Sequence, residues 1–65
     1  MLIERNNFFK KAIGNKVKVL KNGPYYGKIA VLESIHADSF SASVHLQDID
    51  VALELPYEKI CKVVV

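Results

Sequence analysis

Eight consecutive residues in the middle of the chain alternate strictly between polar and apolar side chains. The polar members are Ser39, Ser41, Ser43 and His45, and the apolar members are Phe40, Ala42, Val44 and Leu46. A period of two places successive side chains on opposite faces of a β-strand, so one face is expected in a core and the other in water. A shift of one residue would expose all four apolar side chains, and the register is therefore tightly defined.

Segments on both sides also favour strands, and those at 16–20 and 51–55 repeat the period of two. Further strands are predicted at residues 16–20, 28–35, 51–55 and 60–64. In the first of them two lysines alternate with Val17 and Val19, which gives one cationic and one apolar face. Turn residues predict the connections: a loop at 21–27, turns at 36–38 and 47–50, and a 3₁₀ turn at 57–59 after Pro56. The chain therefore reads as five short strands.

The first 13 residues differ from the rest. Leu2, Phe9 and Ile13 recur at roughly helical spacing, which predicts a short N-terminal helix over 1–13 that ends at Gly14-Asn15. Such a helix would either cap an opening of the core or occupy a surface where a partner docks. The remaining residues, 14–65, are expected to form a single domain.

Size limits both the fold and the chemistry. A chain of 65 residues buries only roughly 60% of its unfolded surface, so five short strands are expected to close into one small, partly open all-β barrel. One cysteine and two separated histidines cannot form a structural zinc site of the usual four-ligand kind. Because no carboxylate pair or activated nucleophile is apparent either, we expect no enzymatic activity and no cofactor.

One stretch combines a strand, a loop that carries glycine and a second strand. It runs from Val17-Lys18-Val19-Leu20 through Gly23, Tyr26 and Gly27 to Ala30 and Leu32. This order resembles the KOW motif, although Ala30 stands where that motif usually has a second glycine. The resemblance implies an SH3-like barrel of the KOW class.

A longer match extends beyond that stretch. Its segments are Asn22-Gly23-Pro24-Tyr25-Tyr26-Gly27, Leu32-Glu33-Ser34-Ile35, Ser39-Phe40-Ser41-Ala42 and Pro56-Tyr57-Glu58-Lys59-Ile60. Over residues 14–63 they resemble the last SH3-like module of the Kin family of nuclear DNA- and RNA-binding proteins. The resemblance implies a nuclear location and a larger parent protein linked to DNA replication and repair and to mRNA processing. The turn at 47–50 is acidic where that module is expected to be basic, so nucleic acid should avoid this edge.

Charge is distributed unevenly along the chain. The net charge is only +2, but residues 10–28 hold six lysines and no carboxylate, whereas six of the seven carboxylates lie within residues 33–58. In SH3-like barrels the first and last strands are neighbours, which would bring Lys16 and Lys18 near Lys59 or Lys62. The residues expected to bind nucleic acid are Lys18, Lys21, Asn22, Tyr25, Tyr26, Lys28 and Lys62.

The chemistry of these residues favours RNA over DNA. Lysines neutralise phosphates without reading sequence, and tyrosines stack on unpaired bases, so single-stranded or structured RNA of low sequence specificity is the expected ligand. Two alternatives remain open for these residues. The lysines can form a solvated face that only confers solubility, and one of the two loop tyrosines, Tyr26, can pack on the barrel rim to position the loop.

Other residues invite structural interpretations. Tyr57 is expected to plug the core, His36 and His45 to face solvent, and Cys61 to be a half-buried, unreactive thiol. The serines of strand 39–46 are expected to point outward as ordinary strand residues. None of them has the spacing of a catalytic triad.

Two further function classes remain beside nucleic-acid binding. A protein-interaction module of a splicing or transcription assembly would use an apolar patch, for which Phe8, Phe9 and Val63-Val64-Val65 are candidates. A reader of methyl-lysine would need an aromatic cage, which three tyrosines, three phenylalanines and no tryptophan supply poorly. In each case a monomer without membrane contact is expected.

Overall fold

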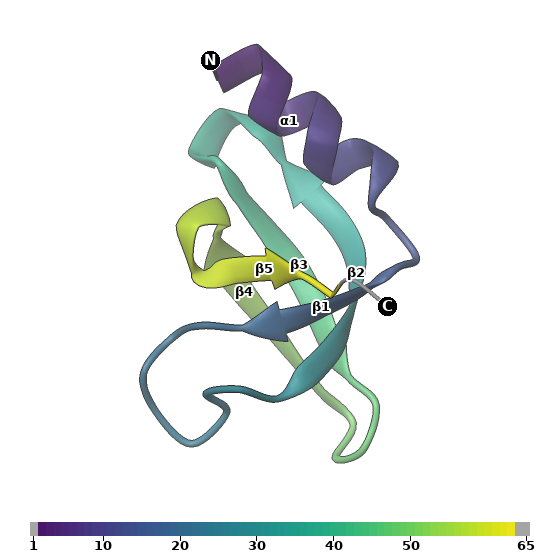
Figure 1. Cartoon of the computed structure of the whole chain (residues 1–65), viewed down its shortest axis with the longest axis vertical. Helices are drawn as coiled ribbons and strands as arrows, with labels where there is room; N and C mark the ends of the chain where they lie inside the picture. Colours follow the sequence, from purple (N-terminus) through teal and green to yellow (C-terminus); the bar gives the residue numbers. More distant parts are fainter. Residues whose placement is uncertain (1, 64–65) are drawn as a thin grey trace.

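The computed structural model describes residues 2–63, with side chains from Asn6 onward. Along the chain it forms the helix α1 (Leu2–Lys11), the strands β1 (Lys16–Val19) and β2 (Ile29–His36), a 3₁₀ turn (Ala37–Ser39), the strands β3 (Ser41–Leu46) and β4 (Val51–Pro56), a second 3₁₀ turn (Tyr57–Lys59) and the strand β5 (Ile60–Lys62). Figure 1 shows these elements.

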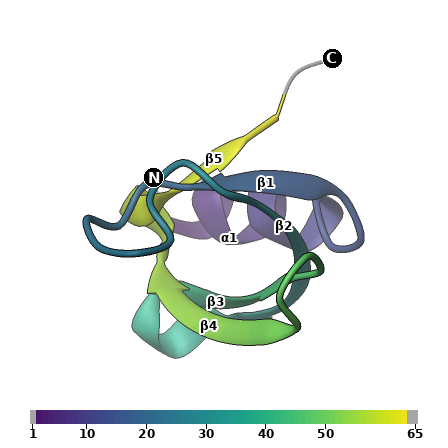
Figure 2. The ribbon, with the colours of Figure 1, turned by 90° about the horizontal axis from the view of Figure 1, so that it is seen from below.

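The five strands form one antiparallel sheet in the order β4-β3-β2-β1-β5. Because β5 pairs with β1, the sheet brings together the first and last strands of the chain. Figure 2 shows the strands curving around a common centre, with α1 across the far side. This arrangement confirms the predicted all-β, SH3-like fold with a short N-terminal helix.

The strict alternation of residues 39–46 produces the central strand, although the strand begins two residues later than the pattern. Ala42, Val44 and Leu46 are fully buried, as expected. Phe40 lies before β3 with a φ of +50°, in the left-handed region, and ends the preceding 3₁₀ turn. Ser41 is buried instead of pointing outward, and its hydroxyl pairs with that of Ser39 at 2.8 Å. The local change of backbone direction at Phe40 explains this departure from simple alternation.

The helix covers part of the core. Phe9 and Ala12 are buried, and the ring of Phe9 stacks on Tyr57 with centroids 4.2 Å apart. Tyr57 is itself buried, which confirms its predicted role as a plug of the core. The expectation that Ile13 shares the buried side is wrong: α1 ends at Lys11, and the following turn leaves Ile13 exposed. The side chain of Leu2 lies outside the described residues.

Strand ends differ from the predicted ends by one or two residues. The first strand stops at Val19, the second is shifted by one residue to end at His36, and β4 includes Pro56. The last strand ends at Lys62, and residue 64, where it was predicted to end, lies outside the described residues. At the β2–β3 pairing a register shift between Leu32 and Ser34 marks a bulge at Glu33.

Candidate nucleic-acid interface

The loop between β1 and β2, residues 20–28, is closed at its base by two hydrogen bonds to Val19. The N–H of Gly27 donates to the Val19 carbonyl at 2.8 Å, and the Val19 N–H donates to the Lys28 carbonyl at 2.9 Å. Two residues on one side therefore oppose one on the other, which is the arrangement of a β-bulge. Gly27 has a φ of +81°, a conformation that glycine adopts at little cost. This bulge fixes where the loop leaves the barrel.

A tight turn shapes the tip of the loop. The N–H of Tyr26 donates to the Gly23 carbonyl at 3.2 Å, and Pro24 occupies the position after Gly23, where its fixed φ favours a turn. The N–H of Lys28 then donates to the Tyr25 carbonyl at 3.1 Å. Successive backbone bonds thus hold the loop in a defined shape although most of its side chains are exposed.

An open pocket of about 140 Å³ lies between this loop and the barrel. It is lined by Val19, Lys21, Asn22, Gly23, Pro24, Tyr25 and Leu53. Three of the residues predicted to bind nucleic acid, Lys21, Asn22 and Tyr25, therefore meet at one concave surface. Most of the lining is apolar, and the ammonium group of Lys21 supplies the positive charge.

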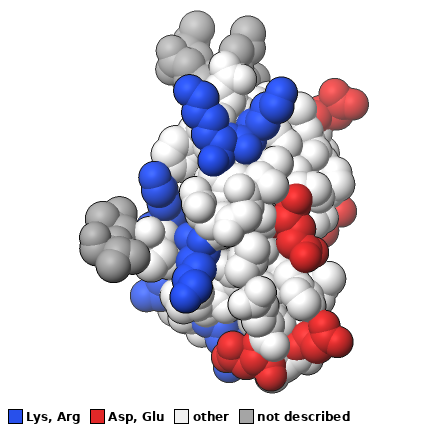
Figure 3. All heavy atoms as spheres, turned by 90° about the vertical axis from the view of Figure 1, so that its right-hand side faces the viewer, with Lys and Arg blue, Asp and Glu red and all other residues white. Residues whose placement is uncertain are grey.

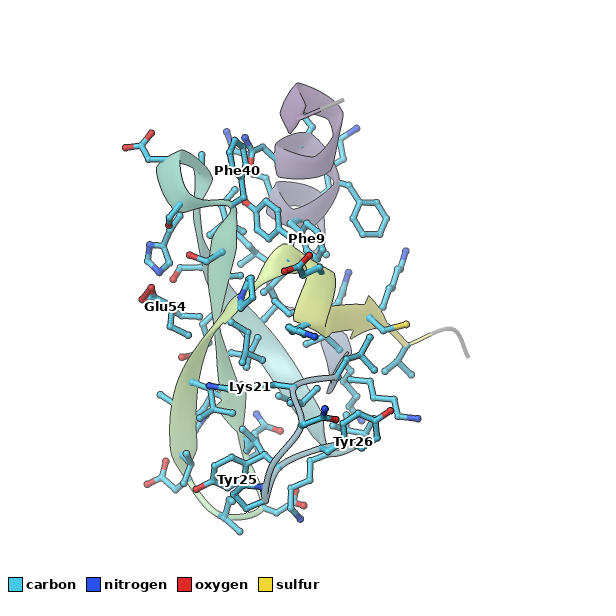
Figure 4. The ribbon with its side chains drawn as sticks, turned by 90° about the vertical axis from the view of Figure 1, so that its left-hand side faces the viewer. Phe9, Lys21, Tyr25, Tyr26, Phe40 and Glu54 are labelled. Carbon is cyan, nitrogen blue, oxygen red and sulfur yellow. The ribbon has the colours of Figure 1, made fainter. Side chains whose placement is uncertain are left out.

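The two loop tyrosines have opposite environments. Tyr25 is half-buried and packs against the core, while Tyr26 is 58% exposed. Figure 4 shows Lys21 and Tyr25 extending toward the side of the molecule that carries Glu54, and Tyr26 pointing away from them. The expectation that Tyr26 packs on the barrel rim is wrong, because Tyr25 takes that place. Tyr26 is thus the ring with a free face for a ligand, and Tyr25 forms a wall of the pocket.

The remaining predicted lysines are spread over the barrel. Lys18 is exposed on β1, and Lys28 is partly buried at the base of the loop. Cross-strand partners point to the same face of a sheet, and Lys62 pairs with the buried Val17 whereas Lys18 pairs with Cys61. Lys62 therefore lies on the opposite face from Lys18, with its Nζ 5.8 Å from the centroid of the Phe8 ring beside α1. The register separates Lys62 from the loop lysines.

Positive and negative side chains are segregated. On the face drawn in Figure 3, most lysines lie toward one side, and the carboxylates lie toward the other side and at the lower end. The turn at 47–50 carries Asp48 and Asp50, both exposed, and the Asp50 carboxylate pairs with His45 Nε2 at 2.7 Å. His45 faces outward on β3 as expected, and 28% of its side chain is exposed. The acidic turn lies outside the loop pocket.

The other histidine and the cysteine lie outside the loop pocket. His36 is exposed, as expected, and its Nε2 lies 2.9 Å from the Ser43 hydroxyl. Cys61 is exposed rather than half-buried. Among the residues with described positions, no three His, Cys, Asp or Glu side chains are placed to hold a metal ion. Within the same part, no helix has the length and apolar character needed to cross a membrane.

Sequence reasoning missed part of the pocket. Val19 and Leu53 form its apolar wall, and neither is among the residues predicted to bind nucleic acid. Leu53 is partly buried rather than fully enclosed, because it lies on β4 at the end of the barrel beside the loop. The alternation of β4 predicts that the side chain of Leu53 points inward. That the loop 20–28 faces Leu53 follows from the curvature of the sheet and not from the sequence pattern.

Five short antiparallel strands, neighbouring first and last strands and a 3₁₀ turn before the last strand define an SH3-like module. Comparison with known proteins assigns it further. The sequence profile of the KIN17 C-terminal SH3 domain matches residues 12–64, and the chain belongs to this family. A KIN17-like protein from Dictyostelium discoideum is 38% identical over 50 residues, which are 77% of this chain and 11% of that protein. The chain therefore corresponds to about a tenth of the relative's length. No solved structure matches it.

Proposed function

We propose that this module binds single-stranded RNA through the loop 20–28, with low sequence specificity and without catalysing a reaction. The observation that carries the proposal is the meeting of Lys21, Asn22 and Tyr25 at one apolar pocket, with the exposed ring of Tyr26 on the same loop. A nucleotide combines an anionic phosphate with a flat apolar base. Because Lys21 and Tyr26 point to different sides of the loop, the loop offers a cation to the phosphate of one nucleotide and an aromatic ring to the base of another.

The proposed contacts divide between phosphate and base. Lys21, supported by Lys18 and Lys28, neutralises phosphates through salt-sensitive contacts. Tyr26 stacks on an unpaired base, and the Asn22 amide donates or accepts one hydrogen bond at the pocket rim. The chain has a single arginine, Arg5, in α1, so the loop contains no bidentate reader of guanine. RNA is favoured over duplex DNA because stacking requires unpaired bases.

The likeness to the Kin family adds a cellular setting to the proposal. We place the module in the nucleus, as a monomeric part of a larger protein linked to DNA replication and repair and to mRNA processing. Membership of the family supports this setting. Binding by the loop is argued from the pocket and from the exposed ring of Tyr26, and its test does not depend on the cellular setting.

The test is fluorescence anisotropy of the chain with a short labelled oligouridylate at low and high salt. Tyr26→Ala is expected to weaken binding by about 1–3 kcal/mol, since one stacked base is lost. Lys21→Ala is expected to weaken binding and to reduce the slope of log K against log salt by about 0.7 for one phosphate contact.

Lys62→Ala provides the matched control, because it removes the same charge at an exposed position outside the loop pocket. It is expected to leave affinity unchanged. Equal losses for Lys21→Ala and Lys62→Ala would show that only total charge matters and would reject the loop as the site. A thymidine oligomer of equal length tests the preference for RNA over single-stranded DNA.

A further inference from the structure

A second concave surface lies on the outer face of the barrel, away from the loop pocket. It has a volume of about 410 Å³. Its lining includes Ile29 and Val31 of β2, Lys16 of β1, Val63 after β5, and Gln47 and Asp48 of the turn between β3 and β4. It shares no lining residue with the loop pocket. We define these six residues as the outer groove.

The register explains why aliphatic side chains gather there. Lys16 lies opposite Val31, and Lys18 lies opposite Ile29 in the β1–β2 pairing, so all four share one face. The N–H of Val63 donates to the Lys16 carbonyl at 3.4 Å, which holds Val63 next to the same row. The opposite face of β1 packs Val17 and Val19 into the core. The aliphatic side chains on the outer face therefore remain outside the core.

Several aliphatic side chains on this face are exposed to solvent. Ile29 is 42% exposed although it lies within a strand, and Val31 and Val63 are partly exposed. Lys16 and Lys18 stand between the aliphatic residues of β2 and Val63, and neither makes an ion pair with any described carboxylate. This face therefore combines exposed aliphatic side chains with lysines that are free of ion pairs to the described carboxylates.

The opposite rim carries the reverse charge. Asp48 and Gln47 border the groove, and Asp50 lies in the same turn. On the side of the molecule drawn in Figure 3, uncharged side chains lie between the lysines and the carboxylates. A phosphate backbone would be repelled at this rim, and the floor offers no aromatic ring for a base to stack on. These features argue against nucleic acid and for a protein segment.

We infer that the outer groove binds a protein segment in which aliphatic side chains are flanked by carboxylates. The aliphatic side chains pack on Ile29, Val31 and Val63, which removes apolar surface from water on both partners. The carboxylates pair with Lys16, the lysine of the groove lining. Donor groups at the other end of the segment meet Asp48 and Gln47, which fixes the direction in which the segment lies.

The test begins with selection from a displayed library of random peptides on the immobilised chain. Enriched peptides are expected to combine Leu, Ile or Val with Asp or Glu. Titration of a synthetic peptide from that set into the ¹⁵N-labelled chain is expected to shift the amide signals of residues 16–18, 29–31, 47–48 and 63, and to leave those of 21–26 in place.

Two pairs of variants localise the binding. Ile29→Ser is expected to weaken the peptide at least tenfold, whereas Ile13→Ser, which changes an isoleucine of nearly equal exposure outside the groove, is expected to have no effect. Lys16→Glu is likewise expected to weaken binding at least tenfold, and Lys10→Glu at the end of α1 is the charge control. Circular dichroism verifies that each variant is folded.

Several results would overturn the inference. The first is that no peptide is enriched, and the second is that the enriched peptides are basic or require Tyr26 for binding. The third is that Ile29→Ser and Ile13→Ser, or Lys16→Glu and Lys10→Glu, weaken binding equally. Concentration-dependent shifts of the same amides in the free chain would assign the groove to a second copy. Shifts there on addition of oligouridylate would assign it to nucleic acid, in contradiction to the argument from Asp48.

Discussion

Replacement of Phe9 by alanine is expected to remove a large part of the stability of this domain. The Phe9 side chain is 6% exposed, and its ring stacks on Tyr57 with an interplanar angle of 18°. Truncation of a buried phenylalanine to alanine costs about 3–5 kcal/mol. At about 0.05–0.15 kcal/mol per residue, a chain of 65 residues has a free energy of unfolding of about 3–10 kcal/mol. The substitution therefore removes a third or more of the total.

Phe8→Ala is the matched control, because it deletes the same atoms from the neighbouring residue. Phe8 is 48% exposed and contacts the Phe9 ring edge-on at 5.2 Å and the Lys62 ammonium at 5.8 Å. Its loss is expected to cost about 0.5–1.5 kcal/mol. Urea denaturation followed by circular dichroism measures both variants against the unaltered chain.

Phe9→Leu keeps the comparison measurable if Phe9→Ala does not fold. Leucine retains much of the apolar volume but loses the stacked ring, and a loss of about 1–2 kcal/mol is expected. In a domain of this size each kcal/mol lowers Tm by roughly 4–8 °C. Equal losses for Phe9→Leu, Phe9→Ala and Phe8→Ala would refute the reasoning, because α1 would then be an appendage and not part of the core.

Substitutions at three further positions test local features of the structure. Gly27→Ala is expected to lower the free energy of unfolding by about 1–2 kcal/mol in a urea titration, since its φ of +81° suits glycine and few other residues. Ser41→Ala is expected to cost about 0.5–1.5 kcal/mol by the same assay, because it removes the bond to the Ser39 hydroxyl; an unchanged midpoint would contradict the role of that pair. Asp50→Asn is expected to be neutral within about 1 kcal/mol, because the pair with His45 is exposed and Asn tolerates the φ of +52°. Asp50→Val is expected to cost more than Asp50→Asn, and equal thermal midpoints would argue against strain at that position.

Period-two alternation predicts β1, β3 and β4, since each of these strands turns one face toward the core. The valines of β1 and the apolar residues of β3 point inward as the pattern requires. The departures occur where the backbone leaves the extended conformation. Phe40, with its positive φ, shifts the start of β3 and buries Ser41, and no sequence period encodes such a residue.

The candidate site was predictable in composition but not in geometry. The loop 20–28 was recognisable from its turn residues, and Lys21, Asn22 and Tyr25 do meet at one pocket. Which tyrosine packs inward depends on the bulge at Gly27, and the sequence pattern does not show how the loop folds over Leu53. Likewise, the face on which Lys62 lies depends on how β5 aligns with β1. Because β5 has only three residues, its sequence alone does not define that alignment.

The outer groove was not predicted for a related reason. Phe8, Phe9 and the C-terminal valines were the expected apolar patch, but Phe9 is buried against Tyr57, and Val64 and Val65 lie outside the described residues. Of these candidates the groove contains Val63, together with side chains from β1, β2 and the turn at 47–50. Their contact arises from the order of strands in the sheet, and no local segment contains it.

The most direct test of the proposed function is to map the RNA contact on the ¹⁵N-labelled chain. A short oligouridylate is expected to shift the amide signals of residues 20–28, with the largest changes at Lys21, Asn22 and Tyr26, and to leave those of Lys62 and α1 unchanged. The shifts should diminish as salt is raised, because they depend on phosphate contacts. Absence of shifts at low salt, or shifts confined to residues outside the loop, would contradict the account.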